Sequence, residues 1–470
     1  MKHKCLVIII LFLAIILLFG CTYNKKIDLH VSTFAQLKEA KYNNNVILDA
    51  DIDCEYETIK PLVINSIDGN NHTIKNAVIK KPSDMYESSS LFNWELKSIK
   101  NIVLDNIELT ASLHGSCAIV LEYGDCTIEN VTVRNSKIIQ TAAKKDTTFT
   151  GIIYGGLRTM NYNVPDPKEY LKSAALINHC SVINCSIELN DSNPYFVGGI
   201  AGYSEKITNC KVDGFSFTNV YKDTAGKISV GGIAGAAKSI MNCVVRNSEF
   251  NIDASYHATG LYPYSNTVTY CGGIVGNGDF QYGDPVSLSY VQSENNVFNI
   301  RSATSCCVGG IIGKLTSSLS EGVSIGNKYN LSDTMTNSTN SFDRFVGGIC
   351  GRSSGSIFGV FSYDNVFSDD ILETNKKANI GFAGICGYNQ STISYGLSCR
   401  NTFEIKADYD SVCMNQFDII DVYTDDMNHN KTNALSVDEL NSLTLELMKT
   451  KFGLSSDKWT IKNGNLVLDF

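Results

Sequence analysis

Apolar and polar side chains alternate over much of the chain, which is the pattern of a β-strand with one buried face. Cys210 and Val212 enclose Lys211, and the alternation continues through Phe215 and Phe217. The spacings of three and four residues that an amphipathic helix needs do not run through this part of the chain. The pattern therefore predicts a succession of short strands.

A second regularity joins an aliphatic residue to an apolar or aromatic residue ten positions later. A unit of this size is too small to bury its own apolar face, so it needs similar units stacked above and below it. The pairs are Ile99 with Leu109, Ile128 with Ile138, Ile177 with Ile187, Ile207 with Phe217, Ile240 with Phe250, Leu288 with Phe298, Leu319 with Tyr329, Ile357 with Phe367 and Ile393 with Phe403.

A glycine-rich motif recurs at intervals of 33 to 41 residues, a period typical of solenoids, with starts at Val197, Val230, Cys271, Val308, Val346 and Phe382. Gly-Gly suits a corner where φ is positive or where two backbones approach closely. Each unit is interpreted as three short strands joined by turns. The predicted fold class is all-β, a right-handed parallel β-helix solenoid in which like residues stack about 4.8 Å apart.

Two units carry a family resemblance. VGGIAGYSEKITNCKV from Val197 and VGGIAGAAKSIMNCVV from Val230 are similar to the GLUG repeat of bacterial surface proteins. The resemblance covers residues 90–405, and the units from Cys271 onward depart further from the pattern. It implies an exported parallel β-helix of the pectin-lyase-like type, and it implies no reaction.

Short helical caps are expected to close both open ends of the solenoid. Ser32 or Thr33, with Gln36, forms a capping box for an N-terminal helix, and Ser436 begins a second helix that precedes a hairpin at 459–468. The predicted division of the chain is a leader at 1–21, an N-terminal cap and first coil at 22–90, GLUG-like repeats at 91–407, and a C-terminal cap with helix and hairpin at 408–470.

The first 21 residues have the features of a secretory leader. Lys2 and Lys4 precede an apolar run that is shorter than the roughly 20 residues of a membrane-spanning helix. Leu18-Phe19-Gly20-Cys21 resembles a bacterial lipobox, although Phe19 stands where a small residue is usual. We expect Cys21 to carry an acyl anchor that holds the protein at the cell membrane, on its extracytoplasmic face or at the cell surface. A plain signal anchor is the alternative.

The charge of the chain is acidic. Its 39 Lys and Arg against 48 Asp and Glu give a formal charge of −9, and removal of Lys2 and Lys4 with the leader gives 37 − 48 = −11. No basic cluster follows the leader, so nucleic acid is excluded as a partner. At 43% hydrophobic residues, the chain is too apolar for general disorder.

The chain has sixteen cysteines, of which fourteen lie after Cys21. Cys180, Cys210 and Cys243 share one position of the repeat, and no CxxC pair or zinc-ligand spacing occurs. These residues are interpreted as a ladder of buried thiols. Disulfide pairing between stacked coils is the alternative, because neighbouring coils bring Cα atoms within reach of each other.

Candidate ligands for a metal are few, and no cofactor is expected. Asp49, Asp51 and Asp53 alternate with apolar residues, so they share one strand face and form a weak Ca²⁺ candidate. Acidic residues on the solvent face of a strand are the simpler interpretation.

Aromatic residues gather in two insertions, at 251–270 and 277–285. Side chains of this kind can stack on sugar rings or anchor a protein partner. The alternative is that they fold back over the edge of the coils. The predicted ligand-binding residues are Tyr256, His257, Tyr262, Tyr264, Tyr270 and Tyr282.

No catalytic residue can be assigned. The chain contains no HExxH, P-loop or dinucleotide-binding motif. Asp369 and Asp370 are interpreted as solvated charges in a loop after a strand. Polysaccharide lyases and hydrolases do use this fold, but function belongs to sites and not to folds.

The leading hypothesis is a non-enzymatic surface lipoprotein that binds a glycan or a surface protein. The alternatives are a carbohydrate-active β-helix enzyme and a structural spacer without a ligand. Three or more charged side chains converging in one groove would favour the enzyme, whereas a groove lined with Ser, Asn and Thr would favour binding.

Overall fold

The computed structural model describes most of the chain after the leader. Nearly all described residues lie in β-strands, and they form a parallel sheet of 33 strands, a sheet of nine strands and a two-stranded hairpin. The described residues are 26–81, 89–111, 115–141, 147–156, 175–190, 195–219, 227–254, 268–278, 286–302, 305–333, 343–370, 379–405, 409–414, 418–425, 433–434, 444–452, 454, 458–462 and 465–468.

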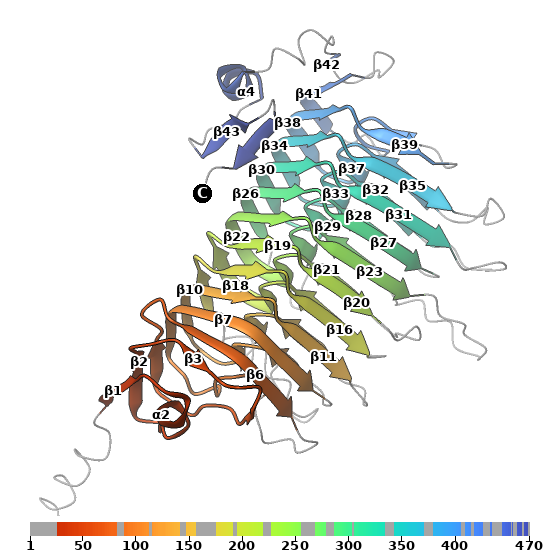
Figure 1. The fold of residues 1–470 in the computed structure, drawn as a ribbon. Helices are drawn as coiled ribbons and strands as arrows, with labels where there is room; N and C mark the ends of the chain where they lie inside the picture. Colours follow the sequence, from red (N-terminus) through yellow and green to blue (C-terminus); the bar gives the residue numbers. More distant parts are fainter. Residues whose placement is uncertain are drawn as a thin grey trace, which may run out of the picture.

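Each strand segment pairs in parallel with the segment one repeat before it and one repeat after it, which is consistent with a β-helix (Figure 1). Five columns of segments follow one another within a coil, and we call them walls 1 to 5. Wall 1 is the nine-stranded sheet of β8 (Ser116–Ala118), β12 (Thr148–Gly151), β17 (Tyr195–Gly198), β21 (Lys227–Gly231), β24 (Val268–Gly272), β28 (Ser305–Gly309), β32 (Asp343–Gly347), β36 (Asn379–Ala383) and β40 (Tyr409–Asp410).

Walls 2 and 3 follow the glycine-rich motif. Wall 2 holds β9 (Leu121–Tyr123), β13 (Tyr154–Gly156), the starts of β18 (Ala201–Thr208) and β22 (Ala234–Arg246), β25 (Val275–Asn277), β29 (Ile312–Leu315), β33 (Cys350–Ser353) and β37 (Cys386–Asn389). Wall 3 holds β1 (Ile27–Val31), β2 (Asn44–Leu48), β5 (Ser66–Asp68), the starts of β7 (Ser98–Ala111) and β10 (Thr127–Arg134), β14 (Leu176–Asn178), later parts of β18 and β22, and the starts of β26 (Ser287–Glu294), β30 (Ser318–Ile325), β34 (Ser356–Tyr363), β38 (Thr392–Cys399) and β41 (Asp418–Thr424).

Walls 4 and 5 complete the coil. Wall 4 holds β3 (Ile52–Asp53), the start of β6 (Thr73–Lys81), the middle of β7, β15 (Ser181–Ile183), β19 (Lys211–Asp213), the ends of β10, β22, β26, β30, β34, β38 and β41, and β42 (Asn433–Ala434) beside β41. Wall 5 holds β4 (Thr58–Ile59), the ends of β6 and β7, β11 (Lys137–Thr141), β16 (Ser186–Asn190), β20 (Ser216–Asn219), β23 (Glu249–Ala254), β27 (Val297–Ser302), β31 (Lys328–Asp333), β35 (Val366–Asp370) and β39 (Thr402–Glu404).

The ten-residue register predicted from the sequence is confirmed by the strand pairing. Ile207, Ile240 and Leu288 are successive partners in wall 3. Phe217 and Phe250 are partners in wall 5, and aromatic rings continue that column with centroids 4.6–5.1 Å apart from Phe250 to Phe403. Stacked like residues thus fill the interior.

The expectation of three strands per unit holds for the coil of β21, β22 and β23, whereas each of the four described coils from β24 to β39 has four strands. Single residues in the left-handed region bend the chain between walls 3 and 4 and between walls 4 and 5. Asn242, with φ of 58°, makes the first bend of its coil, and Asn247, with φ of 51°, makes the second. Asparagine tolerates this conformation better than most residues. One alternating run in the sequence is therefore divided among three walls.

The glycine-rich motif forms the corner between walls 1 and 2 and needs glycine for space. A Cβ atom on Gly235 would lie 2.6 Å from the backbone nitrogen of Val197, in the coil before. Gly231 and Gly232 are similarly enclosed by carbonyl oxygens, and none of the three has a positive φ. Close backbone approach, and not the positive φ also considered for the pair, explains them. The corner lets Val230 and Ile233 both point inward, where both are fully buried.

A buried polar ladder replaces apolar side chains between walls 4 and 5 in the later coils. Asn296, Asn327 and Asn365 are fully buried, and each accepts a hydrogen bond at Oδ1 from the backbone N–H of the preceding coil, at 2.8–3.0 Å. Their Nδ2 groups donate to the hydroxyl three residues earlier, as Asn327 does to Ser324 Oγ at 2.9 Å. The ladder satisfies polar groups that would otherwise be costly to bury.

The thiol ladder is confirmed, since all fourteen cysteines after Cys21 are free and buried. Cys180, Cys210 and Cys243 follow the bend between walls 3 and 4, where the Sγ of Cys210 accepts a hydrogen bond from the backbone N–H of Cys180 at 3.4 Å. Burial raises the pKa of the Cys180 and Cys210 thiols well above their usual value. These thiols therefore behave as small apolar side chains.

The N-terminal helix is α2 (Phe34–Lys38). Thr33 is its N-cap, and Thr33 and Gln36 form the reciprocal capping box that the sequence predicted. Leu37 lies fully buried in the main core. The described part of the C-terminal helix is α4 (Leu445–Phe452), and residues 435–443, where that helix was expected to begin, lie outside the described residues.

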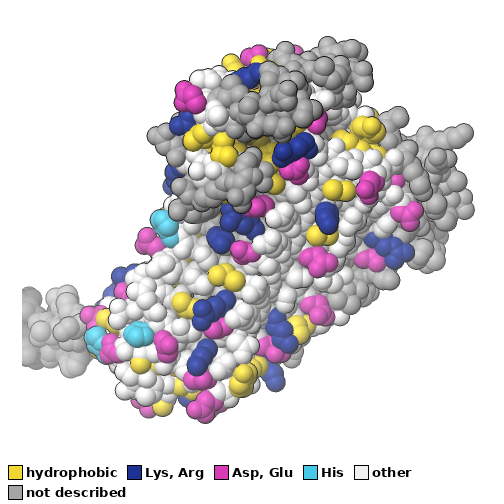
Figure 2. Space-filling view, turned by 45° about the horizontal axis from the view of Figure 1, so that its top comes forward, with side chains coloured by type: hydrophobic (Ala, Val, Ile, Leu, Met, Phe, Trp, Pro, Cys, Tyr) yellow, Lys and Arg dark blue, Asp and Glu magenta, His cyan; other side chains and the backbone are white. Residues whose placement is uncertain are grey.

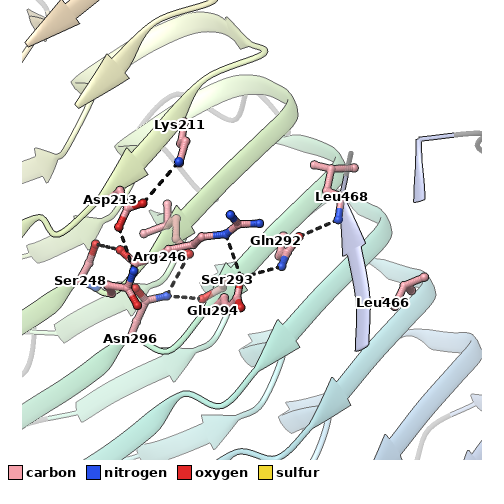
Figure 3. Close-up of polar contacts among 12 residues, drawn as sticks. Lys211, Asp213, Arg246, Ser248, Gln292, Ser293, Glu294, Asn296, Leu466 and Leu468 are labelled. Atoms are coloured by element: carbon pink, nitrogen blue, oxygen red, sulfur yellow. Dashed lines mark hydrogen bonds and ion pairs between the residues drawn. The ribbon is translucent and has the colours of Figure 1, made fainter. Parts of the chain in front are cut away.

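The predicted terminal hairpin is present as β43 (Trp459–Lys462) and β44 (Asn465–Leu468), but its contacts are with the side of the stack rather than with an open end. The Trp459 indole donates to Glu321 at 3.0 Å, and the backbone N–H of Leu468 donates to Gln292 at 2.7 Å (Figure 3). The outward side chains of wall 4 change from Asp213 in β19 to apolar residues, among them Ile325, Tyr363 and Cys399, in the later coils. The hairpin covers those apolar positions.

Candidate binding face

Only one residue of the predicted aromatic site, Tyr270, lies in the part of the chain that the structure describes. Tyr256, His257, Tyr262, Tyr264 and Tyr282 lie outside the described residues. Tyr270 is not a loop residue as expected but belongs to β24, where it is 8% exposed and packs with Cys307 and Phe345 of the next two coils. Its position on wall 1 explains the difference, because the side chain is covered by its stacked neighbours.

The three aspartates of the calcium candidate do not converge. Asp49 accepts a hydrogen bond from the His30 ring at 2.9 Å, Asp51 accepts one from the backbone N–H of Thr73 at 2.9 Å, and Asp53 accepts one from the Asn76 amide at 3.0 Å. These bonds lower the pKa of Asp51 and Asp53. Within the described ranges, no three His, Cys, Asp or Glu side chains are grouped as metal ligands.

A groove of about 490 Å³ lies on the outer face of wall 5, across the ends of β20, β23, β27, β31 and β35. These five strands are neighbours in the stack (Figure 1). It spans five successive coils. Its lining is Thr218, Asn219, Asn251, Ile252, Asp253, Asn299, Ile300, Arg301, Asn330, Leu331, Ser332, Ser368, Asp369 and Asp370. We call it the amide groove.

A row of carboxamides forms the floor of the amide groove. The Asn299 amide donates to Asn251 Oδ1 at 2.7 Å, the Asn330 amide donates to Asn299 Oδ1 at 2.7 Å, and the Ser368 hydroxyl donates to Asn330 Oδ1 at 2.8 Å. Each carboxamide has two N–H donors and two acceptor lone pairs. Asn330 uses one N–H and one lone pair in this row, which leaves one of each for a ligand or for water.

Charged side chains form a second row, nearer the ends of the strands. Arg301 lies 3.5 Å from Asp253 in an ion pair, and Ser332 and Asp370 continue the row in the next coils. Asp370 and its neighbour Asp369 end β35, which corrects their interpretation as loop residues. The amide groove thus holds Asn, Ser and Thr side chains along its floor and four charged side chains near one edge.

The sequence contains a signal for this groove that the period-two pattern did not reveal. Asn251, Asn299 and Asn330 each directly follow the aromatic residue of the ten-residue register. The pattern indicated only that these positions face outward. Asparagine recurs at the same outward position in these coils, and this recurrence indicates a continuous row.

Acidic and basic side chains are mixed over the walls instead of gathered by sign. Figure 2 shows Lys and Arg next to Asp and Glu over much of the visible surface. Pairs between neighbouring coils include Arg134 with Asp105 at 2.9 Å and Arg246 with Glu294 at 2.8 Å (Figure 3). Exposed pairs of this kind contribute about 0–1 kcal/mol each. These ion pairs join opposite charges on neighbouring coils, and they do not single out one part of the surface as a binding site.

The fold and its face therefore define a protein of stacked parallel coils with a polar, amide-lined groove on one wall. Comparison with protein-family models, with curated proteins and with solved structures finds no match. Among the described residues, no helix is long and apolar enough to cross a membrane. The proposed function therefore rests on the residues of the amide groove.

Proposed function

We propose that this protein is a non-enzymatic, membrane-anchored surface lipoprotein whose right-handed parallel β-helix of GLUG-like repeats binds a glycan or a surface protein. The observation that carries the proposal is the carboxamide row in the amide groove. It offers repeated donors and acceptors on a rigid wall, and rigid presentation lowers the entropy cost of binding.

The spacing of the row favours an extended glycan. Neighbouring coils repeat about every 4.8 Å, which is close to the advance of one sugar unit along an extended polysaccharide. A sugar chain lying across the coils would therefore meet an equivalent amide at each unit. The Asp253–Arg301 pair at the edge adds charged hydrogen-bond partners for hydroxyl groups.

The test is a glycan array probed with the soluble chain that starts after Cys21, followed by titration of each hit. Asn299→Ala and Asn330→Ala should each weaken binding by about twofold to tenfold, the value of one hydrogen bond. Asn379→Ala is the matched control, since its exposed amide donates to Asp343 on wall 1. Equal affinity for all three variants would remove the amide groove from the proposal.

The four charged side chains in the amide groove favour a second candidate, a carbohydrate-active enzyme. Every array hit should therefore be incubated with the protein and examined for new reducing or unsaturated ends. Turnover that Asp370→Asn abolishes would replace the binding proposal with the enzyme. If no glycan on the array binds, the ligand to test next is a protein, and a spacer without any ligand is the remaining alternative.

The anchor needs a separate test. The full chain should carry an acyl group and sediment with membranes, whereas Cys21→Ser should carry none. Metabolic labelling with a fatty acid measures the first property and membrane fractionation measures the second. Labelling that survives the substitution would contradict attachment at Cys21.

A further inference from the structure

The outer face of wall 3 carries two rows of side chains through eight successive coils, from β14 to β41. Small hydroxyl residues occupy five of the eight positions in the first row and four of the eight in the second. The first row is Leu176, Lys206, Ser239, Ser287, Ser318, Ser356, Thr392 and Asp418, and the second is Asn178, Thr208, Met241, Ser289, Ser320, Phe358, Ser394 and Ile420. We call this surface the serine face.

Exposed apolar side chains stand among these small residues. Leu176 is 50% exposed, Met241 38% and Ile420 50%, while Phe358 is partly exposed. Single exposed apolar residues are normal on a protein surface and need no explanation. These four are notable because all of them lie on one wall.

The four exposed apolar residues are spaced symmetrically along the wall. Counting coils from β14 to β41, Leu176 is in the first, Met241 in the third, Phe358 in the sixth and Ile420 in the eighth. A twofold axis parallel to the strands, between β26 and β30, relates the first coil to the eighth and the third to the sixth. Such a self-complementary arrangement is what an isologous contact between two identical chains requires.

We infer that a second copy of this chain docks on the serine face, with its coils running in the opposite direction. Met241 of each copy then packs on Phe358 of the other, and Leu176 lies beside Ile420. Ser287 meets Ser318 at the centre, where small side chains let the two sheets approach closely.

Charge supports this direction over the opposite one. Lys206 and Asp418 are both exposed members of the first row. In the antiparallel arrangement, Asp418 of one copy is offset from Lys206 of the other by one strand spacing, about 4.8 Å along the stack. With the coils running in the same direction, the first row of one copy would face the second row of the other. Lys206 would then face Thr208 and Asp418 would face Ile420, so neither charge would meet an opposite charge.

A single contact of this kind is weak. Seven strand spacings of about 4.8 Å and a strand of three residues, about 10 Å, give roughly 340 Å² per copy. A stable interface needs about 800 Å² per partner. Many copies on one surface would compensate, because linked contacts gain avidity without new interactions.

The antiparallel direction also places the two N-terminal ends at opposite ends of the pair. The N-terminal coils lie at one end of the stack and the later coils at the other (Figure 1). If Cys21 carries the proposed anchor, paired copies would join two facing membranes. This last step rests on the proposed function, whereas the pairing itself does not.

Chemical cross-linking tests the pairing in the soluble chain that begins after Cys21. We expect a mixture of Met241→Cys and Phe358→Cys to form covalent dimers with a short bis-maleimide reagent, because facing sheets pack about 10 Å apart, beyond the roughly 4.4–6.8 Å between Cα atoms that a disulfide allows. Each variant alone should stay monomeric, because like residues would be displaced by three strand spacings, about 14 Å, along the stack. Dimers from each variant alone, or none from the mixture, would overturn the antiparallel pairing.

A charge exchange gives a second measurement that requires no new cysteine. Lys206→Glu and Asp418→Lys should each weaken self-association by about tenfold in analytical ultracentrifugation, and the double variant should restore it. Failure of the double variant to restore it would contradict the contact. Asn330→Ala should leave self-association unchanged, which separates this result from any failure of glycan binding.

Vesicles test the joining of membranes. The chain attached to vesicles through its N-terminus should cluster them, and Met241→Lys should abolish the clustering. Pairing in solution without vesicle clustering would overturn the membrane step, and clustering that survives Met241→Lys would overturn the role of the serine face.

Discussion

Removing Asn327 should destabilise the protein far more than removing an identical residue three positions later. Asn327 is fully buried; its Oδ1 accepts from the backbone N–H of Asn296 at 2.8 Å, and its Nδ2 donates to Ser324 Oγ at 2.9 Å. Asn327→Ala leaves both partners buried without this bond. Each unsatisfied group costs about 1–3 kcal/mol, so the free energy of unfolding should fall by roughly 2–6 kcal/mol.

Asn330→Ala is the control, since Asn330 is exposed and water can replace its partners. Its effect should stay within about 0.5 kcal/mol. Urea unfolding followed by circular dichroism gives the difference in midpoint, and hydrogen exchange at the Asn296 amide reports the local effect. Equal midpoints for the two variants, with the Asn296 amide still protected, would refute the structural role of the buried ladder.

Two further substitutions test other parts of the coil. The hydrogen bond that the His30 ring donates to Asp49 raises the pKa of His30 above 6.5, so Asp49→Asn should return it toward that value in an NMR titration. The stability that this pair contributes should be fully present below pH 6.5 and should be lost as the pH rises through the raised pKa of His30; an unchanged pKa would contradict the pairing. Gly235→Ala should lower the free energy of unfolding by several kcal/mol, since its Cβ would lie 2.6 Å from the Val197 backbone, and wild-type stability of that variant would show that the corner tolerates a side chain.

The sequence was sufficient to predict the stacking of coils, because burial inside a solenoid repeats with the coil. Ile240 and Phe250 could be placed in separate columns from spacing alone, and their strand partners confirm this. The number of walls was not predictable in the same way. A single residue in the left-handed region, such as Asn242, bends the strand and shifts the alternation by one position, so that Ile240 and Cys243, three residues apart, are both fully buried.

The amide groove and the hairpin contact were harder for a different reason. Both depend on outward-facing residues, and alternation says only that such residues avoid the core. Asn330 at the groove and Tyr363 beneath the hairpin occupy outward positions of the same kind. The difference is that the terminal hairpin covers Tyr363 and leaves Asn330 uncovered. The hairpin lies about a hundred residues further along the chain than Tyr363. The direction of coiling and the GLUG relationship stay predictions.

The connection from wall 5 to wall 1 has consequences for how such a protein can diversify. Two residues separate β27 at Ser302 from β28 at Ser305, whereas thirteen separate β23 at Ala254 from β24 at Val268, yet both pairs of strands keep the same register with their neighbours. Each doubling of the length of a connection costs only about 0.6 kcal/mol. These connections leave the ends of the strands that carry the amide groove. Insertions and deletions at this corner can therefore accumulate over evolutionary time while the coils keep their register, so the length of the connection can change faster than the scaffold does.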